Sequence, residues 1–205
     1  MSQFTYEAVD KKTPLETYEW DNTWIDQTAR TDAKRVFYIG DSISVGTRRI
    51  ATERASGSVL FDGFGTSKAL DNPYFFDSIR LFAAQLPYRD AVIFNNGLHG
   101  WHLEDENEYR AHYERAVEFL MREFAGTPIW LVLTTTVRNE TREARVCARN
   151  RVVREIAEKF GLPIIDLYRV SSEFVALRAE DGVHYSRDGY TKFADHILET
   201  VTANV

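Results

Sequence analysis

Three residues of this sequence have the side-chain types that together activate a hydroxyl nucleophile. Ser42 follows Gly40-Asp41 at the point where a short apolar run, RVFYI, gives way to a polar one. Asp181 and His184 stand three residues apart in DGVH, a spacing that lets the carboxylate reach one imidazole nitrogen and leaves the other facing away. A serine hydroxyl is a weak nucleophile without such a base. A helix N-cap formed by Asp41 or Ser42 is the structural alternative for this bend.

These residues need a framework that brings distant segments together, and the chain alternates strand-like with helix-like patterns. The runs expected to be strands are 35–39, 58–62, 90–95, 129–136 and 163–167. The runs expected to be helices are 44–55, 73–86, 105–124, 142–160 and 187–202. This alternation indicates parallel pairing through right-handed crossovers. We therefore expect an α/β fold, a three-layer α/β/α sandwich around a five-stranded parallel sheet of the flavodoxin-like kind.

Polar residues follow several of these expected strands. Gly63 and Gly65 come after the second strand, Asn96 and His99 after the third, and Arg138 after the fourth. Ligands of open α/β sheets bind in the crevice outside the carboxyl ends of the strands. We therefore expect these residues to lie near Ser42.

Two blocks of the sequence resemble a known family. GDSISVG (40–46) resembles the first block of the SGNH or GDSL hydrolases, and DGVHYSRDGY (181–190) resembles their last block, Asp-x-x-His. The resemblance implies the SGNH hydrolase fold and a serine esterase mechanism. It makes Ser42 the nucleophile, His184 the general base and Asp181 the partner that orients the base. This chemistry needs no cofactor and no metal.

The resemblance also implies an oxyanion hole, in which the backbone N–H of Ser42 takes part. The glycine of the family's second block is best matched by Gly63, with Gly65 as the second choice. The third block, Gly-x-Asn-Asp, is matched by GLHG, which places His99 where the family has asparagine. His99 donating through a ring N–H is favoured, and Asn96 is the alternative donor.

Further residues near these blocks suggest secondary roles. His99 and His102 form H-x-x-H, but no third ligand stands at a recognisable spacing, so we expect no metal site. Trp101, Arg138 and Tyr185 are expected to bind substrate, because aromatic faces suit sugar rings and an arginine suits an anionic group.

Composition excludes several classes of partner. The net charge of −6 and pI near 5.4 argue against nucleic-acid and membrane surfaces, which require clustered Lys and Arg. The single cysteine, Cys147, cannot form an intrachain disulfide. The start, MSQFTYEAVDKK, lacks the pattern of a secretory leader, which favours a cytoplasmic protein, although removal of a leader would leave the same pattern.

The chain is expected to form one domain preceded by a packed extension. Residues 1–33 include Trp20 and Trp24 and are expected to lie as an aromatic extension on a hydrolase domain, 34–205. The expected function is hydrolysis of short-acyl, above all acetyl, esters of a carbohydrate, with a small-molecule ester as substrate and the oligomeric state left open. An acyltransferase with the same triad is the alternative. A flavodoxin-like module that binds phosphate or a nucleotide is the non-catalytic alternative, but the chain lacks the glycine-rich phosphate motifs.

Overall fold

A computed structural model describes residues 14–86 and 88–202 and shows strands alternating with helices. The strands are β1 (Asp21–Trp24), β2 (Lys34–Gly40), β3 (Val59–Thr66), β4 (Ala91–Phe94), β5 (Ile129–Val132) and β6 (Ile164–Ile165). The α-helices are α1 (Ser42–Arg54), α2 (Phe75–Ala83), α3 (Glu106–Glu123), α4 (Glu140–Phe160), α5 (Leu167–Glu173) and α6 (Arg187–Thr202), with a 3-10 turn at Val175–Leu177. Within the described ranges, no helix combines the length and apolar character needed to cross a bilayer.

The strands form one sheet in the order β1-β3-β2-β4-β5-β6. The five strands from β2 to β6 pair in parallel, as expected, while β1 pairs antiparallel with β3 at the edge. The sixth strand was not predicted, because DNTW is polar and all four of its residues are exposed. The strand predicted at 129–136 was too long, since β5 ends at Val132 and the chain continues as an irregular loop.

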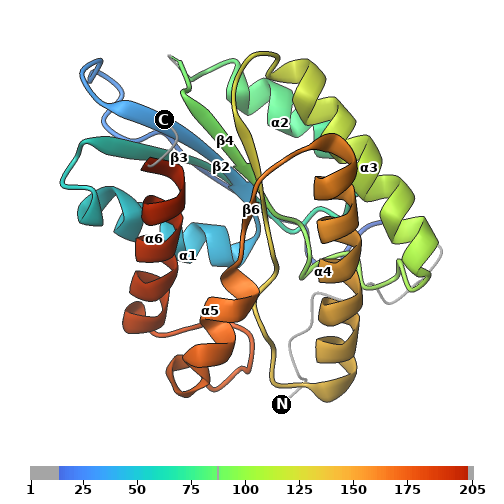
Figure 1. Ribbon diagram of the computed structural model, residues 1–205. Coiled ribbons are helices and arrows are strands. Elements are labelled where there is room, and N and C mark those ends of the chain that lie inside the picture. The colour runs from blue at the N-terminus through green and yellow to red at the C-terminus, as the bar shows by residue number, and fades with distance from the viewer. Residues whose placement is uncertain (1–13, 87, 203–205) are drawn as a thin grey trace.

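Side chains alternate between the two faces of the sheet, and helices cover both faces (Figure 1). Phe37 and Ile39 of β2 belong to a core packed under α2, α3 and α4. Val36 and Tyr38 of the same strand belong to a second core packed under α1, α5 and α6. The predicted three-layer α/β/α sandwich is confirmed, and the strands are buried on both faces as a parallel sheet requires.

The described part of the N-terminal extension is fastened to the sheet by a buried arginine. Arg35 of β2 is fully buried and forms an ion pair of 2.8 Å with Asp62 of β3. Its Nη2 atom donates to the backbone carbonyls of Asp26 and Gln27, at 2.7 and 2.9 Å. Residues 1–13 of the predicted extension lie outside the described residues.

Candidate active site

Ser42 lies at the first turn of α1, directly after the end of β2. Asp41 is the N-cap residue, and its side chain accepts the N–H of Ile43 at 2.9 Å. Gly40 allows the tight bend, because a Cβ there would lie 2.7 Å from the Cβ of Ser44. Asp41 therefore takes the capping role, and the Ser42 hydroxyl is left at the helix N-terminus, where the dipole favours developing negative charge.

The three residues singled out by the sequence form one chain of hydrogen bonds. His184 Nε2 lies 2.8 Å from Ser42 Oγ, and His184 Nδ1 lies 2.7 Å from Asp181 Oδ2. The other oxygen of Asp181 accepts the backbone N–H groups of Val183 and His184, each at 2.9 Å. Partial burial alone would raise the pKa of Asp181, but these hydrogen bonds outweigh it and hold the pKa below its usual range. The carboxylate thus stays ionised beside the imidazole.

Arg138 holds the loop that carries Asp181 and His184. Its Nη1 and Nη2 atoms donate to the carbonyls of Glu180 and Ala179, at 2.8 and 3.0 Å. Its own backbone N–H donates to the carbonyl of Gly182 at 2.8 Å. Arg138 was predicted to bind substrate, whereas in the structure its guanidinium binds the loop that carries Asp181 and His184.

Tyr185 has a structural position as well. It is only 5% exposed, and its hydroxyl lies 3.0 Å from Thr136 Oγ1 and 3.1 Å from the Thr136 carbonyl oxygen. Its ring packs against Phe193 with a centroid separation of 4.8 Å. Tyr185 was expected to contact substrate, but its side chain is buried against Thr136 and Phe193, next to His184 in the chain.

The two candidate glycines lie within β3. Gly63 pairs with Tyr38 and Trp24 inside the ladder, and a Cβ on it would meet the Arg48 side chain at 2.3 Å. Gly65 pairs with Gly40, at the end of β2. The structure therefore does not bring Gly63 to Ser42, because β3 runs four residues beyond the predicted end of that strand, as far as Thr66.

The two candidate side-chain donors, Asn96 and His99, are both buried. Asn96 Nδ2 donates to the carbonyl of Lys68 at 2.9 Å, so its amide holds a neighbouring loop. His99 lies close enough to Asp41 for its charge to act on that carboxyl group. Burial raises the pKa of Asp41, and the charges of His99 and His184 oppose the rise. His99 is thus electrostatically coupled to the turn that carries Ser42.

The two histidines of H-x-x-H face different carboxylates. His99 Nδ1 lies 3.5 Å from Glu16 Oε1, and His102 Nε2 lies 2.8 Å from Asp71 Oδ2. No group of three or more His, Cys, Asp or Glu residues suited to a metal occurs in the described part of the chain. The pattern is accounted for by two separate histidine–carboxylate pairs.

Trp101 is half-buried beside α4 and lies under three arginines. The guanidinium carbons of Arg142, Arg145 and Arg149 stand 5.4, 5.6 and 4.8 Å from a ring centroid of Trp101. The Arg145 side chain also donates to the Trp101 carbonyl. These cation–π contacts fix the indole, and its expected contact with substrate remains a proposal.

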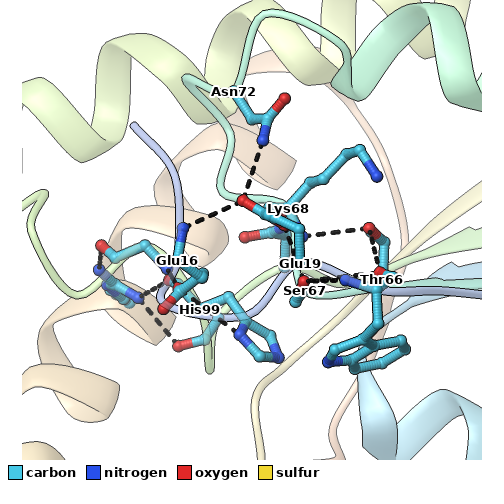
Figure 2. Close-up of polar contacts among 12 residues, drawn as sticks. Glu16, Glu19, Thr66, Ser67, Lys68, Asn72 and His99 are labelled. Atoms are coloured by element: carbon cyan, nitrogen blue, oxygen red, sulfur yellow. Dashed lines mark hydrogen bonds and ion pairs between the residues drawn. The ribbon is translucent and has the colours of Figure 1, made fainter. Parts of the chain in front are cut away.

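Sequence reasoning missed Glu16, one of two residues of the N-terminal segment that contact His99. Besides Glu16, Trp20 lies edge-on to the imidazole, with ring centroids 6.0 Å apart. Figure 2 shows how Glu16 and its neighbours are joined by polar contacts to the loop after β3. The aromatic content of this segment was the one available signal, and it gave no indication of Glu16.

Solved structures match the chain, although no protein-family model and no curated protein sequence does. The acetyl xylan esterase AlAXEase matches with a TM-score of 0.63 and 18% identity, over 82% of this chain and 99% of its own. A lipolytic protein of the G-D-S-L family from Veillonella parvula matches with a TM-score of 0.69 and 18% identity, over 83% and 99%. This chain has the SGNH/GDSL hydrolase fold.

A transferase domain shares this SGNH/GDSL fold. The C-terminal catalytic domain of peptidoglycan O-acetyltransferase A from Streptococcus pneumoniae matches with a TM-score of 0.64 and 20% identity, over 83% of this chain and 96% of that domain. Proteins named as hydrolases and as a transferase therefore have the SGNH/GDSL fold in common. The comparisons establish the fold, and the chemistry rests on the side chains of this chain.

Proposed function

We propose that this protein is a serine esterase that hydrolyses short-acyl esters, with acetyl as the preferred acyl group. The hydrogen-bonded chain from Ser42 through His184 to Asp181 carries the proposal. An imidazole 2.8 Å from a serine hydroxyl is in position to take its proton, and a carboxylate on the other nitrogen fixes the tautomer required. An acetyl xylan esterase and a lipase/acylhydrolase with the same fold support this class of reaction.

The mechanism follows from these positions. Ser42 Oγ attacks the ester carbonyl while His184 takes its proton, and Asp181 stabilises the imidazolium. His184 then protonates the leaving alcohol, and a water molecule, deprotonated by His184, releases the acid from the acyl-enzyme.

The tetrahedral intermediate needs donors for its oxyanion. The backbone N–H of Ser42 lies in the first turn of α1, where N–H groups have no intrahelical partner. We assign His99 as the side-chain donor, from the match of GLHG to the family's third block. Asn96, whose Nδ2 uses one of its two N–H groups on the Lys68 carbonyl, is the alternative. Of the two glycines, Gly65 replaces Gly63 as the candidate, since the strand register places it beside Gly40.

The carbohydrate part of the proposal rests on aromatic surface and on the named relatives. Trp20 and Trp101 flank the loop that carries His99 and offer flat faces of the kind that sugar rings use. The relatives include an acetyl xylan esterase and a peptidoglycan O-acetyltransferase domain. Acyl transfer to an alcohol through the same triad is the second candidate function, since the transferase domain shares the fold.

A panel of esters tests the proposal by varying the acyl chain and the alcohol independently. With p-nitrophenyl esters, kcat/KM is expected to fall once the acyl chain exceeds about four carbons, because a short pocket excludes further methylenes. Ser42→Ala should abolish turnover, whereas Ser172→Ala, at an exposed position of α5, should not. A preference for octanoate would contradict the short-acyl assignment. Product analysis with an added sugar alcohol separates hydrolysis from transfer.

A further inference from the structure

Arg149 of α4 is a buried arginine for which the proposed mechanism provides no role. It is 2% exposed, and burial lowers its pKa to about 10, so the guanidinium is still charged near neutral pH. Burying a cation is costly unless hydrogen bonds or an opposite charge compensate for it. The hydrogen bonds of Arg149 go to the loop after β4 (residues 95–105), which carries both candidate side-chain donors, Asn96 and His99.

The guanidinium of Arg149 binds four backbone carbonyls of this loop. Its Nη1 atom donates to the carbonyls of Gly97 and His99, at 3.1 and 2.7 Å. Its Nη2 atom donates to those of Gly100 and Leu103, at 2.6 and 3.4 Å. Because the donors of a guanidinium have a fixed planar geometry, one rigid group sets the relative orientation of these peptide groups. A lysine ammonium is a single point charge and cannot bind the same set.

The peptide group between His99 and Gly100 is held at both of its ends. Its C=O accepts from Arg149, and its N–H donates at 2.7 Å to Oε1 of the buried Glu16, which lies beside His99 in Figure 2. The charge of Glu16 also favours the charged form of Arg149. Gly100 has a φ of 67°, a left-handed conformation that suits glycine. Rotation of this peptide group would therefore break hydrogen bonds to two buried charged side chains.

Arg149 also acts on the backbone of Asn96, through Tyr109. The guanidinium carbon lies 4.5 Å from the ring centroid of Tyr109, a buried residue of α3, and 4.8 Å from a ring centroid of Trp101. Such cation–π contacts are stronger when both groups are removed from water. The hydroxyl of Tyr109 donates to the Asn96 carbonyl at 2.7 Å. The backbone of both candidate donors is thus fixed by groups that meet at Arg149.

We propose that Arg149 is a positioning residue, which holds the loop after β4 in the conformation that donates to the oxyanion before substrate binds. This inference rests on the proposed function, and it applies whether His99 or Asn96 is the side-chain donor. An oxyanion hole is effective because its donors are oriented in advance and need no reorganisation during the reaction. A looser loop should therefore weaken binding of the transition state and leave binding of the ester almost unchanged.

Kinetics of Arg149→Lys test the positioning role, with Arg151→Lys as the matched control. Arg151 lies on the same helix, but its side chain is exposed and pairs with Glu106. Titration with a fluorophosphonate counts the active sites, so that a smaller amount of folded enzyme does not lower the kcat obtained. We expect Arg149→Lys to lower this kcat between about 10-fold and the roughly 10²-fold cost of losing one donor, with KM changed less than about 2-fold. An unchanged kcat per active site, or an equal loss in Arg151→Lys, would overturn the proposal.

Inhibition by a trifluoromethyl ketone reports on the oxyanion hole itself. Such a ketone adds to the hydroxyl of a nucleophilic serine and forms a tetrahedral oxyanion, so its inhibition constant Ki measures how well the donors bind that charge. We expect the Ki of Arg149→Lys to rise by about the factor by which kcat/KM falls. An unchanged Ki beside a lowered kcat would place the loss outside the oxyanion hole and contradict the positioning role.

A third measurement needs no variant, so it applies even if Arg149→Lys does not fold. NMR of the arginine side chains in the free wild-type protein should show slow rotation about the Cζ–Nη bonds of Arg149 and slow exchange of its N–H protons with water. Rotation and exchange as fast as those of the exposed Arg151 would show that the loop is not held in advance. The proposed function fails separately, if the wild type hydrolyses no ester and Ser42 is not labelled, and the NMR result still decides whether Arg149 holds the loop.

Discussion

Arg138 Nη1 lies 2.8 Å from the carbonyl oxygen of Glu180, the residue immediately before Asp181. Because Nη2 binds the carbonyl of Ala179, one planar guanidinium fixes two consecutive peptide groups. Lys cannot reproduce this fork, since an ammonium is a single point charge. We expect Arg138→Lys to lower kcat about 10-fold by loosening His184, given that misplacement by about 1 Å can cost 10²-fold.

The Arg138 experiment also distinguishes the two roles considered for this residue. Steady-state kinetics with a neutral ester should show the loss in kcat, and Arg187→Lys, an exposed arginine paired with Glu53, should show none. A rise in KM alone, found only with anionic substrates, would restore the substrate-binding role.

Replacement of any member of the Ser42–His184–Asp181 chain should remove most of the activity. Ser42→Ala, His184→Ala and Asp181→Ala are each expected to cost on the order of 10³-fold or more in kcat, and the losses should not add in double variants. Thermal unfolding should change little, because the side chains of Asp181 and His184 are 52% and 39% exposed. Labelling by a fluorophosphonate at a serine other than Ser42 would refute this assignment.

The loop after β4 should separate a catalytic residue from a structural one. His99→Ala is expected to lower kcat roughly 10²-fold, the usual cost of losing one oxyanion donor. Asn96→Ala should instead destabilise the fold by about 1–3 kcal/mol, because it leaves the partly buried Lys68 carbonyl without its donor. Kinetics and chemical denaturation of the two variants test this division. A larger loss of kcat in Asn96→Ala would reverse the two assignments.

The His102–Asp71 pair should make stability depend on pH. The hydrogen bond that His102 donates to Asp71 raises the pKa of His102 above its ordinary value, in spite of burial. A histidine whose pKa is raised in the folded state stabilises the fold. This contribution is fully present below the pKa of the unfolded chain, about 6.5, and is lost as pH rises through the pKa of the folded protein. The difference in unfolding free energy between wild type and His102→Gln should therefore shrink from about pH 5.5 to pH 9.

His196 on α6 is a control of opposite sign for that measurement. Burial lowers the pKa of His196, so its folded-state contribution becomes more favourable as pH rises toward the unfolded pKa. Denaturation curves of His196→Gln should accordingly show the reverse trend against wild type. The same trend for both variants would show that neither His102 nor His196 controls the pH dependence of stability.

The parts of the site that depend on side-chain chemistry were predictable from the sequence. A serine after a strand and an aspartate three residues before a histidine have few other uses in combination, so Ser42, Asp181 and His184 were identified without a structure. Gly63 was a poorer choice, because the end of β3 is set by its neighbours in the sheet. The strand continues through glycines that leave room for Arg48 and Val45 of α1, a property that no local pattern reveals.

The roles of Arg138 and Glu16 depend on which loop each one meets. An arginine after a strand can bind an anion or a peptide carbonyl, and its residue type does not decide between them. Glu16 lies 84 positions from Gly100, whose N–H it binds, and such a contact has no signature in a single sequence. The fold class was predictable because alternation of strands and helices repeats along the whole chain, whereas the polar strand β1 carries no such repeat.

The short edge strand β1 also protects the protein against self-association. Its four residues are exposed and polar apart from Trp24, and Asp21 pairs with Lys68 on the outer rim. Beneath it, all eight residues of β3 are buried. β1 pairs with Gly63–Thr66 of β3, so a chain trimmed to residue 34, the expected domain boundary, would leave the backbone groups of these four residues as an open edge, the kind of edge that recruits strands from other molecules. The segment that reaches His99 therefore also covers part of the edge of the sheet.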